Sequence, residues 1–271
     1  MIRVIVSDLD GTLLDENHQV SSFSLNTLRS LIAKGYHFVI ATGRHYHDVA
    51  YIARNLGGGI NLISSNGAQV HDGDGNLKHD QTLPLDVVNQ AIAISRSYDL
   101  HRNLYRATDW LAEEENERLL AHHQQSQFCY RVTRFVDEDL SAVSKLLFIG
   151  DPNDLADFKA ELVVRLGDCV NIVSSKDDLL EIMHKNVSKG RALKEVLGRL
   201  ESHASHVMAF GDAMNDADML DLVGHPVVME NAQSALKTHL SEFKLASTNY
   251  QDGVAHYLID YGLADNPAAE I

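Results

Sequence analysis

The sequence is poor in cysteine and in long apolar runs, and each shortage argues against a class of protein. Its 271 residues include two cysteines, Cys129 and Cys169, which lie far apart and lack the spacing of metal ligands. Neither a disulfide scaffold nor a zinc site is therefore expected. No apolar run approaches the roughly 18 residues that could span a bilayer. Because Asp8 and Asp10 interrupt the first apolar stretch, it does not resemble a signal peptide, and we expect a cytoplasmic protein without a membrane partner.

Positive charge is also scarce. Lysine and arginine together number 23 against 38 acidic residues, which gives a formal net charge of −15. Such a charge disfavours binding to nucleic acid. An anionic ligand could still bind where a metal ion or a lysine reverses the local field. The length and the apolar content of 45% allow one large domain or two, and a monomer is the default expectation.

Both ends of the chain alternate between strand and helix patterns. Residues 1–82 contain three apolar runs typical of buried strands, IRVIVSD, YHFVIATG and NLISSNG, with helices predicted between them. Either Ser21 or Ser22 can cap the first helix, and HDGDGN indicates a hairpin turn rather than a calcium loop. From residue 186 the alternation resumes with the strands HVMAFGD, HPVVM and KLAS and with helices at 189–200, in NDADMLDLVG, around 232–240 and in VAHYLIDYG. This order predicts right-handed crossovers and a parallel sheet.

Residues 83–185 have a different character. Helices are predicted over 85–98, near 113–125 and over 154–166, and strands in LYRATDWLA, CYRVTRF, SKLLFIG and CVNIVSS. This mixture is typical of an α+β domain with a partly antiparallel sheet. Tyr105 and Trp110 could face the site from this domain or pack against its sheet, and we expect packing. We therefore expect an α/β protein whose Rossmann-like, parallel-sheet core comprises residues 1–82 and 186–271, with residues 83–185 inserted as an α+β domain.

Polar residues gather where the core strands are predicted to end. Asp8 and Asp10 follow the first strand, Thr42-Gly43-Arg44 end the second, the GDAMND motif (211–216) follows HVMAF, and Lys189 opens a helix. Ligands bind beyond the carboxyl ends of parallel strands, so these side chains should converge. Four carboxylates together require a cation, and an all-oxygen set suits Mg²⁺ better than zinc. Taken alone, DLDG could be a capped turn, but the four motifs together indicate a site.

The motifs DLDGT, ATGR, VSKG and GDAMND stand in an order that resembles the haloacid dehalogenase superfamily. More narrowly, the sequence is similar to the Cof-like sugar-phosphate phosphatases of that superfamily. DLDGTLL, FVIATGRH, SSNGAQVHD, VSKGRAL and AFGDAMNDADML look most like the bacterial pyridoxal phosphate phosphatases of this branch. The resemblance covers nearly the whole chain and is weaker across residues 83–185, which correspond to a cap domain.

The resemblance implies a role for each motif residue. Asp8 would be the nucleophile that forms an aspartyl-phosphate, and Asp10 would act first as general acid and then as general base. Mg²⁺ would be held by Asp8, the backbone carbonyl of Asp10 and Asp212, with Asp216 supporting it directly or through water. The groups expected to hold phosphoryl oxygens are Leu9, Thr42, Gly43, Lys189 and Asn215. Those expected near the rest of the substrate are Arg44 and Asn66, with His45 as a weaker candidate.

Asp10 and the place of the cap narrow the expected reaction. An aspartate at this position resembles the pattern of the family's phosphatases and phosphomutases, whereas the dehalogenases of the family lack a carboxylate there. The inserted segment lies between Thr42 and Lys189. In the pattern of the family's sugar phosphomutases, by contrast, the cap comes before the threonine motif. We expect a Mg²⁺-dependent phosphatase acting on a small phosphorylated metabolite, such as pyridoxal phosphate or a sugar phosphate. Phosphoryl transfer to another metabolite, and a binding module without turnover, are the alternative interpretations.

Overall fold

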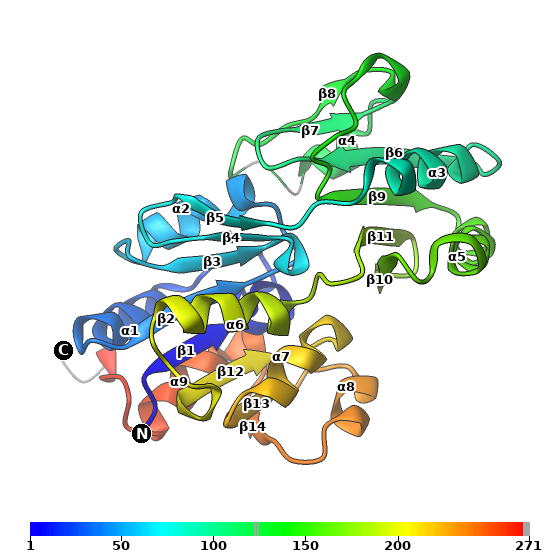
Figure 1. Cartoon of the computed structure of the whole chain (residues 1–271). Coiled ribbons are helices and arrows are strands. Elements are labelled where there is room, and N and C mark those ends of the chain that lie inside the picture. The colour runs from blue at the N-terminus through cyan, green and yellow to red at the C-terminus, as the bar shows by residue number, and fades with distance from the viewer. Residues whose placement is uncertain (122, 124, 268–271) are drawn as a thin grey trace. The chain divides into compact units, whose positions relative to one another are not determined.

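The computed structural model describes residues 1–121, 123 and 125–267. Within them the chain divides into two compact units (Figure 1). The first contains residues 1–44, residues 49–78 and the chain from Ser188 onward, and the second contains residues 45–48 and 79–187. The sequence predicted changes of character at residues 83 and 186. The first unit is thus assembled from both ends of the chain.

The first unit is built on an eight-stranded sheet with the order β14-β13-β12-β1-β2-β3-β4-β5. Its strands are β1 (Val4–Ser7), β2 (His37–Ala41), β3 (Asn61–Ser64), β4 (Gln69–His71), β5 (Leu77–Asp80), β12 (Val207–Gly211), β13 (His225–Met229) and β14 (Lys244–Ala246). Neighbouring strands from β14 to β3 pair in parallel, and β4 pairs antiparallel with β3. All residues of β1 are buried, as expected for a largely β-branched strand at the centre of a covered sheet. The predicted parallel core is confirmed.

Helices cover this sheet (Figure 1). They are α1 (Ser22–Ala33), α2 (Tyr46–Asn55), α6 (Lys189–Arg199), α7 (Ala217–Leu222), α8 (Ser234–His239) and α9 (Gly253–Asp260). Of the two predicted caps of α1, Ser21 is the one used, because its hydroxyl accepts the backbone N–H of Ser24 at 3.0 Å. α1 packs against α9 and α6 against α7. The sheet extends in both directions from β1, and such folds place their ligands at the point where the strand order reverses.

A tight turn separates β4 from β5. The carboxylate of Asp72 accepts hydrogen bonds from the backbone N–H groups of Asp74 at 3.0 Å and of Asn76 at 2.8 Å. An aspartate that bonds the backbone two and four residues on stabilises a turn in this way. The hairpin turn expected in HDGDGN is therefore confirmed.

The second unit has a six-stranded sheet with the order β10-β11-β9-β6-β7-β8. Its elements are α3 (Leu85–Ser95), β6 (Leu100–Tyr105), β7 (Trp110–Ala112), α4 (Glu117–Ala121), β8 (Arg131–Val132), β9 (Lys145–Gly150), α5 (Pro152–Leu166), β10 (Val170–Lys176) and β11 (Leu179–His184). Its strands pair antiparallel except β7 and β8. Phe148 and Phe158 pack edge to face with ring centroids 4.7 Å apart, joining β9 to α5. The expected mixture of helices and largely antiparallel strands is observed.

The segment LYRATDWLA, expected as one strand, forms two. β6 ends at Tyr105 and β7 begins at Trp110, and the turn between them is closed by the backbone N–H of Arg106, which donates to the carbonyl of Asp109 at 3.0 Å. The guanidinium of Arg106 also donates to the Asp109 carboxylate, at 2.7 Å and 2.6 Å. The expectation of a single strand was wrong, because this turn relies on a salt bridge rather than on a glycine or proline. Tyr105 and Trp110 are both buried and stack at 5.2 Å, which confirms their packing role.

Strand β11 was not predicted from the sequence. It lies between β10 and β9 and carries Glu181 at its centre. The charge of Glu181 interrupts the apolar pattern LLEIMH, but Lys145 of β9 donates to its carboxylate at 2.7 Å, and both side chains are buried. The strand could have been found only by recognising that a distant lysine compensates this charge.

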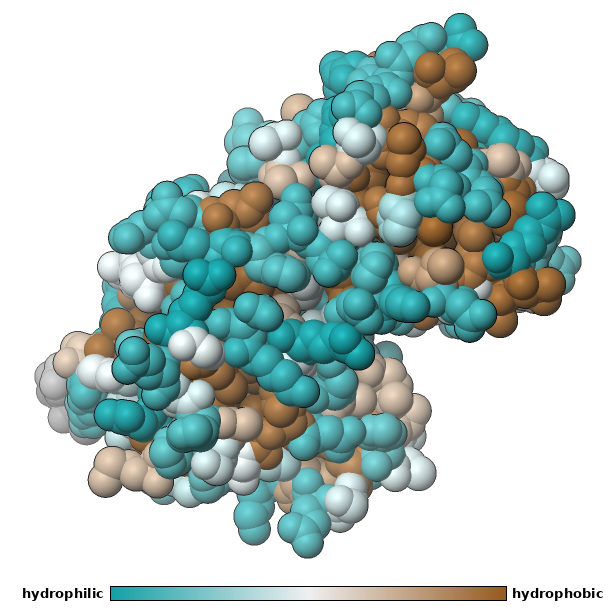
Figure 2. All heavy atoms as spheres, in the orientation of Figure 1, coloured by the Kyte–Doolittle hydropathy of each residue, from teal (hydrophilic) through white to brown (hydrophobic). Residues whose placement is uncertain are grey.

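Other differences concern the length of elements. The helix expected near residues 113–125 is reduced to α4, and the part of that prediction at residues 122 and 124 lies outside the described residues. The strand expected in CYRVTRF is reduced to β8. Among the described residues, no helix is long and apolar enough to cross a bilayer. Figure 2 shows hydrophilic side chains over most of the visible face, with hydrophobic ones in smaller groups.

Candidate active site

The centre of the site is the turn that follows β1. The backbone N–H of Asp8 donates to the carbonyl of Phe210 in β12 at 3.1 Å, so the sheet itself fixes the position of Asp8. Gly11 adopts a φ of +80°, and a Cβ at this position would collide with the carboxylate of Asp212. Glycine is therefore required twice over, by its left-handed backbone and by the close approach of a carboxylate. The DLDGT sequence allows two acidic loops to meet beyond β1 and β12.

Lys189 joins the nucleophile candidate to a second carboxylate. Its Nζ donates to Oδ1 of Asp8 at 2.7 Å and to Oδ1 of Asp216 at 2.6 Å. Lys189 and Asp216 have no exposed surface, and Asp8 is 5% exposed. Lys189 is the first residue of α6, whose N-cap is Ser188, and the positive end of the helix dipole disfavours a cation there. The two carboxylates compensate for this placement: burial lowers the pKa of Lys189, but the charges of Asp216 and Asp8 together with their hydrogen bonds raise it above its ordinary value.

Asp216 is held entirely by protein donors. Its Oδ1 accepts from Lys189, and its Oδ2 accepts the backbone N–H groups of Asp212 at 3.0 Å and Ala213 at 3.1 Å. Because both oxygens are engaged, Asp216 is suited to fixing the loop after β12 and the ammonium of Lys189. It is less suited to binding a metal ion directly.

Asp212 completes a group of three carboxylates. One oxygen from each of Asp8, Asp212 and Asp216 lies within 4.8 Å of the others. Thr12 donates to Oδ1 of Asp212 at 2.9 Å. Burial and the charge of Asp216 raise the pKa of Asp212 to about 6, and burial raises that of Asp8 well above its usual value, aided by Asp216 and Asp212. A single lysine does not balance three carboxylates, so the cluster attracts a further cation.

Asp10 lies in a different environment from Asp8. Arg44 forms a two-pronged ion pair with it, through Nε to Oδ2 at 2.7 Å and through Nη2 to Oδ1 at 2.5 Å. The Nδ1 atom of His18 lies 3.1 Å from the same Oδ1. Burial raises the pKa of Asp10, but the hydrogen bonds and charges of Arg44 and His18 outweigh it and lower the pKa below the ordinary value. The two aspartates are therefore electrostatically unequal, with Asp10 favoured as an ionised base.

Thr42 lies on the same loop as Arg44, and Asn215 lies on the same loop as Asp212 and Asp216. The Thr42 hydroxyl oxygen accepts the backbone N–H of Arg44 at 3.2 Å, so its hydrogen can be donated elsewhere. The amide Nδ2 of Asn215 donates to Oδ1 of Asn66 at 3.0 Å. Gly43 faces the Asn66 amide, since a Cβ at position 43 would lie 3.0 Å from its Oδ1.

The structure thus brings the predicted residues into three connected groups. Asp8, Lys189, Asp212 and Asp216 form the first, Asp10 and Arg44 the second, and Thr42, Gly43, Asn66 and Asn215 the third. Leu9 is fully buried in the turn between Asp8 and Asp10, and its carbonyl accepts the N–H of Leu14 at 2.9 Å.

His45, a weaker candidate, instead belongs to the second unit. It stacks on Phe128, with ring centroids 4.5 Å apart, and its Nε2 lies 2.8 Å from the carbonyl of Arg106. Sequence reasoning assigned no role to Thr12 or His18. Thr12 belongs to the DLDGT motif, and this position in the motif could have indicated its place in the site. Nothing in the sequence pattern around His18 indicated contact with Asp10.

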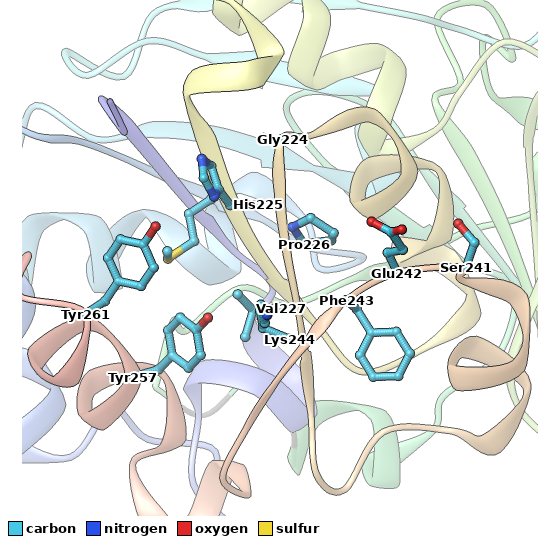
Figure 3. A pocket seen from close by; sticks show the side chains of 11 residues that line it. Gly224, His225, Pro226, Val227, Ser241, Glu242, Phe243, Lys244, Tyr257 and Tyr261 are labelled. Carbon is cyan, nitrogen blue, oxygen red and sulfur yellow. The ribbon is translucent and has the colours of Figure 1, made fainter.

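A separate cavity lies at the opposite, amino ends of the strands of the same sheet. It has a volume of about 470 Å³ and lies between the beginnings of β13 and β14 and the end of α9 (Figure 3). Tyr257 and Tyr261 stack at 6.2 Å along one wall. None of the motif residues lines it, so its size does not make it a rival for the catalytic centre.

Comparison with known proteins now assigns the family. Residues 5–258 match the family of haloacid dehalogenase-like hydrolases. The chain belongs to this family. It is 37% identical over 261 residues to a protein of Haemophilus influenzae, provisionally named a phosphatase, with 94% of this chain and 95% of that protein covered. It is 34% identical over 258 residues to the HMP-PP phosphatase of Yersinia pestis, with 95% of this chain and 94% of that protein covered.

The likeness extends to three dimensions. A haloacid dehalogenase-like hydrolase of Bacteroides thetaiotaomicron superimposes with a TM-score of 0.87 at 26% identity, with 96% of this chain and 100% of that chain covered. Both the superfamily and the α/β fold predicted from the sequence are confirmed. The coverage shows that the similarity includes the second unit as well as the first.

Proposed function

We propose that this protein is a Mg²⁺-dependent phosphatase that hydrolyses small phosphorylated metabolites through an aspartyl-phosphate. The observation that carries the proposal is the placement of Asp8, which the sheet fixes beyond β1 and which Lys189 contacts at 2.7 Å beside Asp212 and Asp216. A carboxylate held rigidly next to a cation, at the ligand-binding end of a parallel sheet, is suited to nucleophilic attack on a phosphoryl group. Family membership and the names of the relatives support the same class of reaction.

The residues present fit a magnesium ion. The cluster is made of oxygen donors and has more negative charge than Lys189 balances, and Asp8 and Asp212 have raised pKa values because of burial and neighbouring charge. Asp8, Asp212 and the backbone carbonyl of Asp10 would hold the ion, with Asp216 in support through the loop after β12. When bound, the ion would neutralise charge on the phosphoryl oxygens and on the carboxylates.

The protein's own side chains would attack the phosphoryl group and stabilise its charge. Asp8 attacks phosphorus and forms the aspartyl-phosphate. An ammonium group has three donors, and Lys189 uses two of them for Asp8 and Asp216 within the described chain, so the third is available to a phosphoryl oxygen. Thr42 has its hydroxyl hydrogen available for the same purpose, because its oxygen accepts from Arg44. Such fixed donors stabilise the charge that develops in phosphoryl transfer.

Asp10 is proposed to act as the general acid and the general base. Its pairing with Arg44 and His18 favours the ionised form, which is the form needed to activate the water that hydrolyses the aspartyl-phosphate. To protonate the leaving oxygen in the first step, Asp10 must first take up a proton and weaken its bond to Arg44. Arg44 therefore affects both steps through Asp10.

The substrate follows less directly from the site. The name HMP-PP phosphatase of the Yersinia relative makes HMP-PP a candidate, and the sequence resemblance adds pyridoxal phosphate and sugar phosphates. Phosphoryl transfer to a metabolite acceptor would use the same Asp8 chemistry and is the alternative reaction. The complete set of Asp8, Asp10, Thr42 and Lys189 disfavours a role limited to binding.

The proposal includes a cytoplasmic location and a monomeric state. The two free, exposed cysteines fit a reducing compartment.

Phosphate release from an aryl phosphate tests the reaction class. We expect activity in Mg²⁺, its loss in EDTA and its return when Mg²⁺ is added back. Under single turnover, hydrolysis releases one inorganic phosphate per substrate whether or not an acceptor alcohol is present. Full activity in EDTA would contradict the metal requirement, and phosphate that appears only on an acceptor would favour the transferase. A panel of HMP-PP, pyridoxal phosphate and hexose phosphates, ranked by kcat/KM, would then identify the substrate.

A further inference from the structure

The turn that follows β3 has an unusual backbone. Ser65, Asn66 and Gly67 adopt φ values of 48°, 56° and 100°, so three successive residues lie in the left-handed region. This conformation is unfavourable for residues with a Cβ, and asparagine tolerates it better than most. Strained backbone of this kind persists where the surrounding structure imposes it, often beside a functional site. We refer to residues 65–67 as the left-handed turn.

The side chain of Asn66 points into the motif loops rather than toward solvent. It is 3% exposed, and its Oδ1 accepts the hydrogen bond from Nδ2 of Asn215 at 3.0 Å. Gly43 packs directly against the same amide, and any larger residue at position 43 would press on it. Asn66 therefore contacts two of the loops that are proposed to hold the phosphoryl group.

The backbone of the left-handed turn makes equally close contacts. The N–H of Asn66 donates to the carbonyl of Thr42 at 2.9 Å, and the N–H of Ser65 donates to the carbonyl of Arg44 at 2.8 Å. Gly67 lies so close to Ser188 that a Cβ at position 67 would collide with the Ser188 carbonyl. Since Ser188 is the N-cap of α6, the turn also borders the first residue of that helix, Lys189.

We infer that Asn66 is a positioning residue that fixes the distance between the phosphate-binding loops. The left-handed turn is bonded to the loop of Thr42 and Arg44, it packs against the residue before Lys189, and the Asn66 amide orients Asn215. Its side chain acts through these groups, because it is buried and its Oδ1 is occupied by Asn215. This inference rests on the proposed phosphatase function, and it assigns Asn66 a different part from the substrate contact expected from the sequence.

Two substitutions separate the side chain from the backbone. Glycine adopts a φ of 56° without steric cost, so Asn66→Gly keeps the turn and removes the amide. We expect its kcat/KM for an aryl phosphate to fall by about 10- to 100-fold, the range expected when catalytic groups are slightly misplaced, with little change in melting temperature. Asn66→Ala should show the same kinetic loss together with a lower melting temperature. Glu201→Gly is the matched control, because Glu201 is exposed, follows the C-terminal end of α6 rather than a motif, and has a φ of 48°.

The constant for competitive inhibition by inorganic phosphate gives the readout that a merely structural role would not move. If Asn66 positions the phosphate-binding groups, this constant rises about as much in Asn66→Gly as kcat/KM falls. In an Asn215→Ala background, Asn66→Gly should add little further loss, since its effect passes largely through Asn215. Multiplicative losses in the double variant, or wild-type kinetics and phosphate inhibition in Asn66→Gly, would overturn the inference. Wild-type activity in Mg²⁺ is measured alongside, so a failure of the phosphatase proposal itself would be visible separately.

Discussion

Each unit buries a lysine against a carboxylate, and the two arrangements differ in charge. In the second unit, Lys145 donates to Glu181 at 2.7 Å and lies 4.6 Å from the centre of the Tyr105 ring. In the first unit, Lys189 donates to two carboxylates, and Asp212 lies beside them. The pair of Lys145 and Glu181 cancels its own charge, whereas the cluster around Lys189 has a surplus of negative charge. A buried ion pair is therefore a weak sign of function, and an uncompensated cluster is a stronger one.

The largest expected difference between the two lysines is in activity. Lys189→Met removes a donor that stabilises the transferring phosphoryl group, and we expect kcat/KM to fall by about 10³-fold. Lys145→Met is the matched control and should keep kcat/KM of the folded protein near the wild-type value. The measurement is hydrolysis of an aryl phosphate at saturating Mg²⁺. Equal losses in both variants would show that Lys189 has no larger part in catalysis than Lys145.

Replacing Lys145 should affect the stability of the fold, although it should leave activity nearly unchanged. Lys145→Met removes the ammonium that donates to the buried Glu181, and we expect the free energy of unfolding to fall by about 3 kcal/mol. Adding Glu181→Leu replaces the pair by apolar groups and should restore most of that loss. Urea unfolding followed by circular dichroism measures both. If the double variant is as unstable as the single one, the lost stability does not come from breaking the Lys145–Glu181 pair.

The second unit should also lose stability in acid because His45 is buried as a neutral ring. Burial lowers its pKa from 6.5 to about 4, so between these values the unfolded chain binds a proton that the folded chain does not. The contribution of neutral His45 is complete above pH 6.5 and is lost as the pH falls, to a total of about 3 kcal/mol. The difference in unfolding free energy between wild type and His45→Gln should shrink by that amount from pH 7 to pH 4. A pH-independent difference would contradict the burial of a neutral His45.

The smallest expected effect concerns the surplus charge of the first unit. Asp212→Asn removes one of three neighbouring carboxylates and should raise the stability of the metal-free protein by about 1 kcal/mol while impairing hydrolysis. Added Mg²⁺ should raise the melting temperature of the wild type, because an ion that binds the folded state stabilises it, and should do so much less in the variant. A thermal melt with and without Mg²⁺ measures both effects. Destabilisation of the metal-free variant would refute the idea of surplus charge.

Much of the parallel core and of the motif chemistry could be predicted because the signals are local. Unbroken apolar runs mark β1, β2 and β12, and glycine and polar residues directly after them mark the strand ends. The topology of a parallel sheet then brings Asp8 and Asp212 to one edge without further information. The combination of local pattern and general topology was sufficient for fold and family.

The features that sequence reasoning missed depend on partners far away in the chain. β11 contains a central Glu181 that is acceptable only because Lys145 faces it. The bond from Arg44 to Asp10 and the contact of His18 with the same carboxylate give no sign in the motif pattern. The left-handed conformation of Asn66 is imposed by Thr42, Ser188 and Asn215 together. Such features follow from the packed structure and not from any short window of sequence.

The covalent phosphoryl intermediate proposed on Asp8 is tested most directly by acid quenching. Wild-type protein mixed with an aryl phosphate and Mg²⁺ is quenched within one turnover, and its peptides are analysed by mass spectrometry. We predict a phosphoryl group on Asp8 in the wild type, its absence in Asp8→Asn, and its slower formation and decay in Asp10→Asn. Continued phosphate release by Asp8→Asn, or wild-type turnover without phosphoryl transfer to Asp8, would contradict the account.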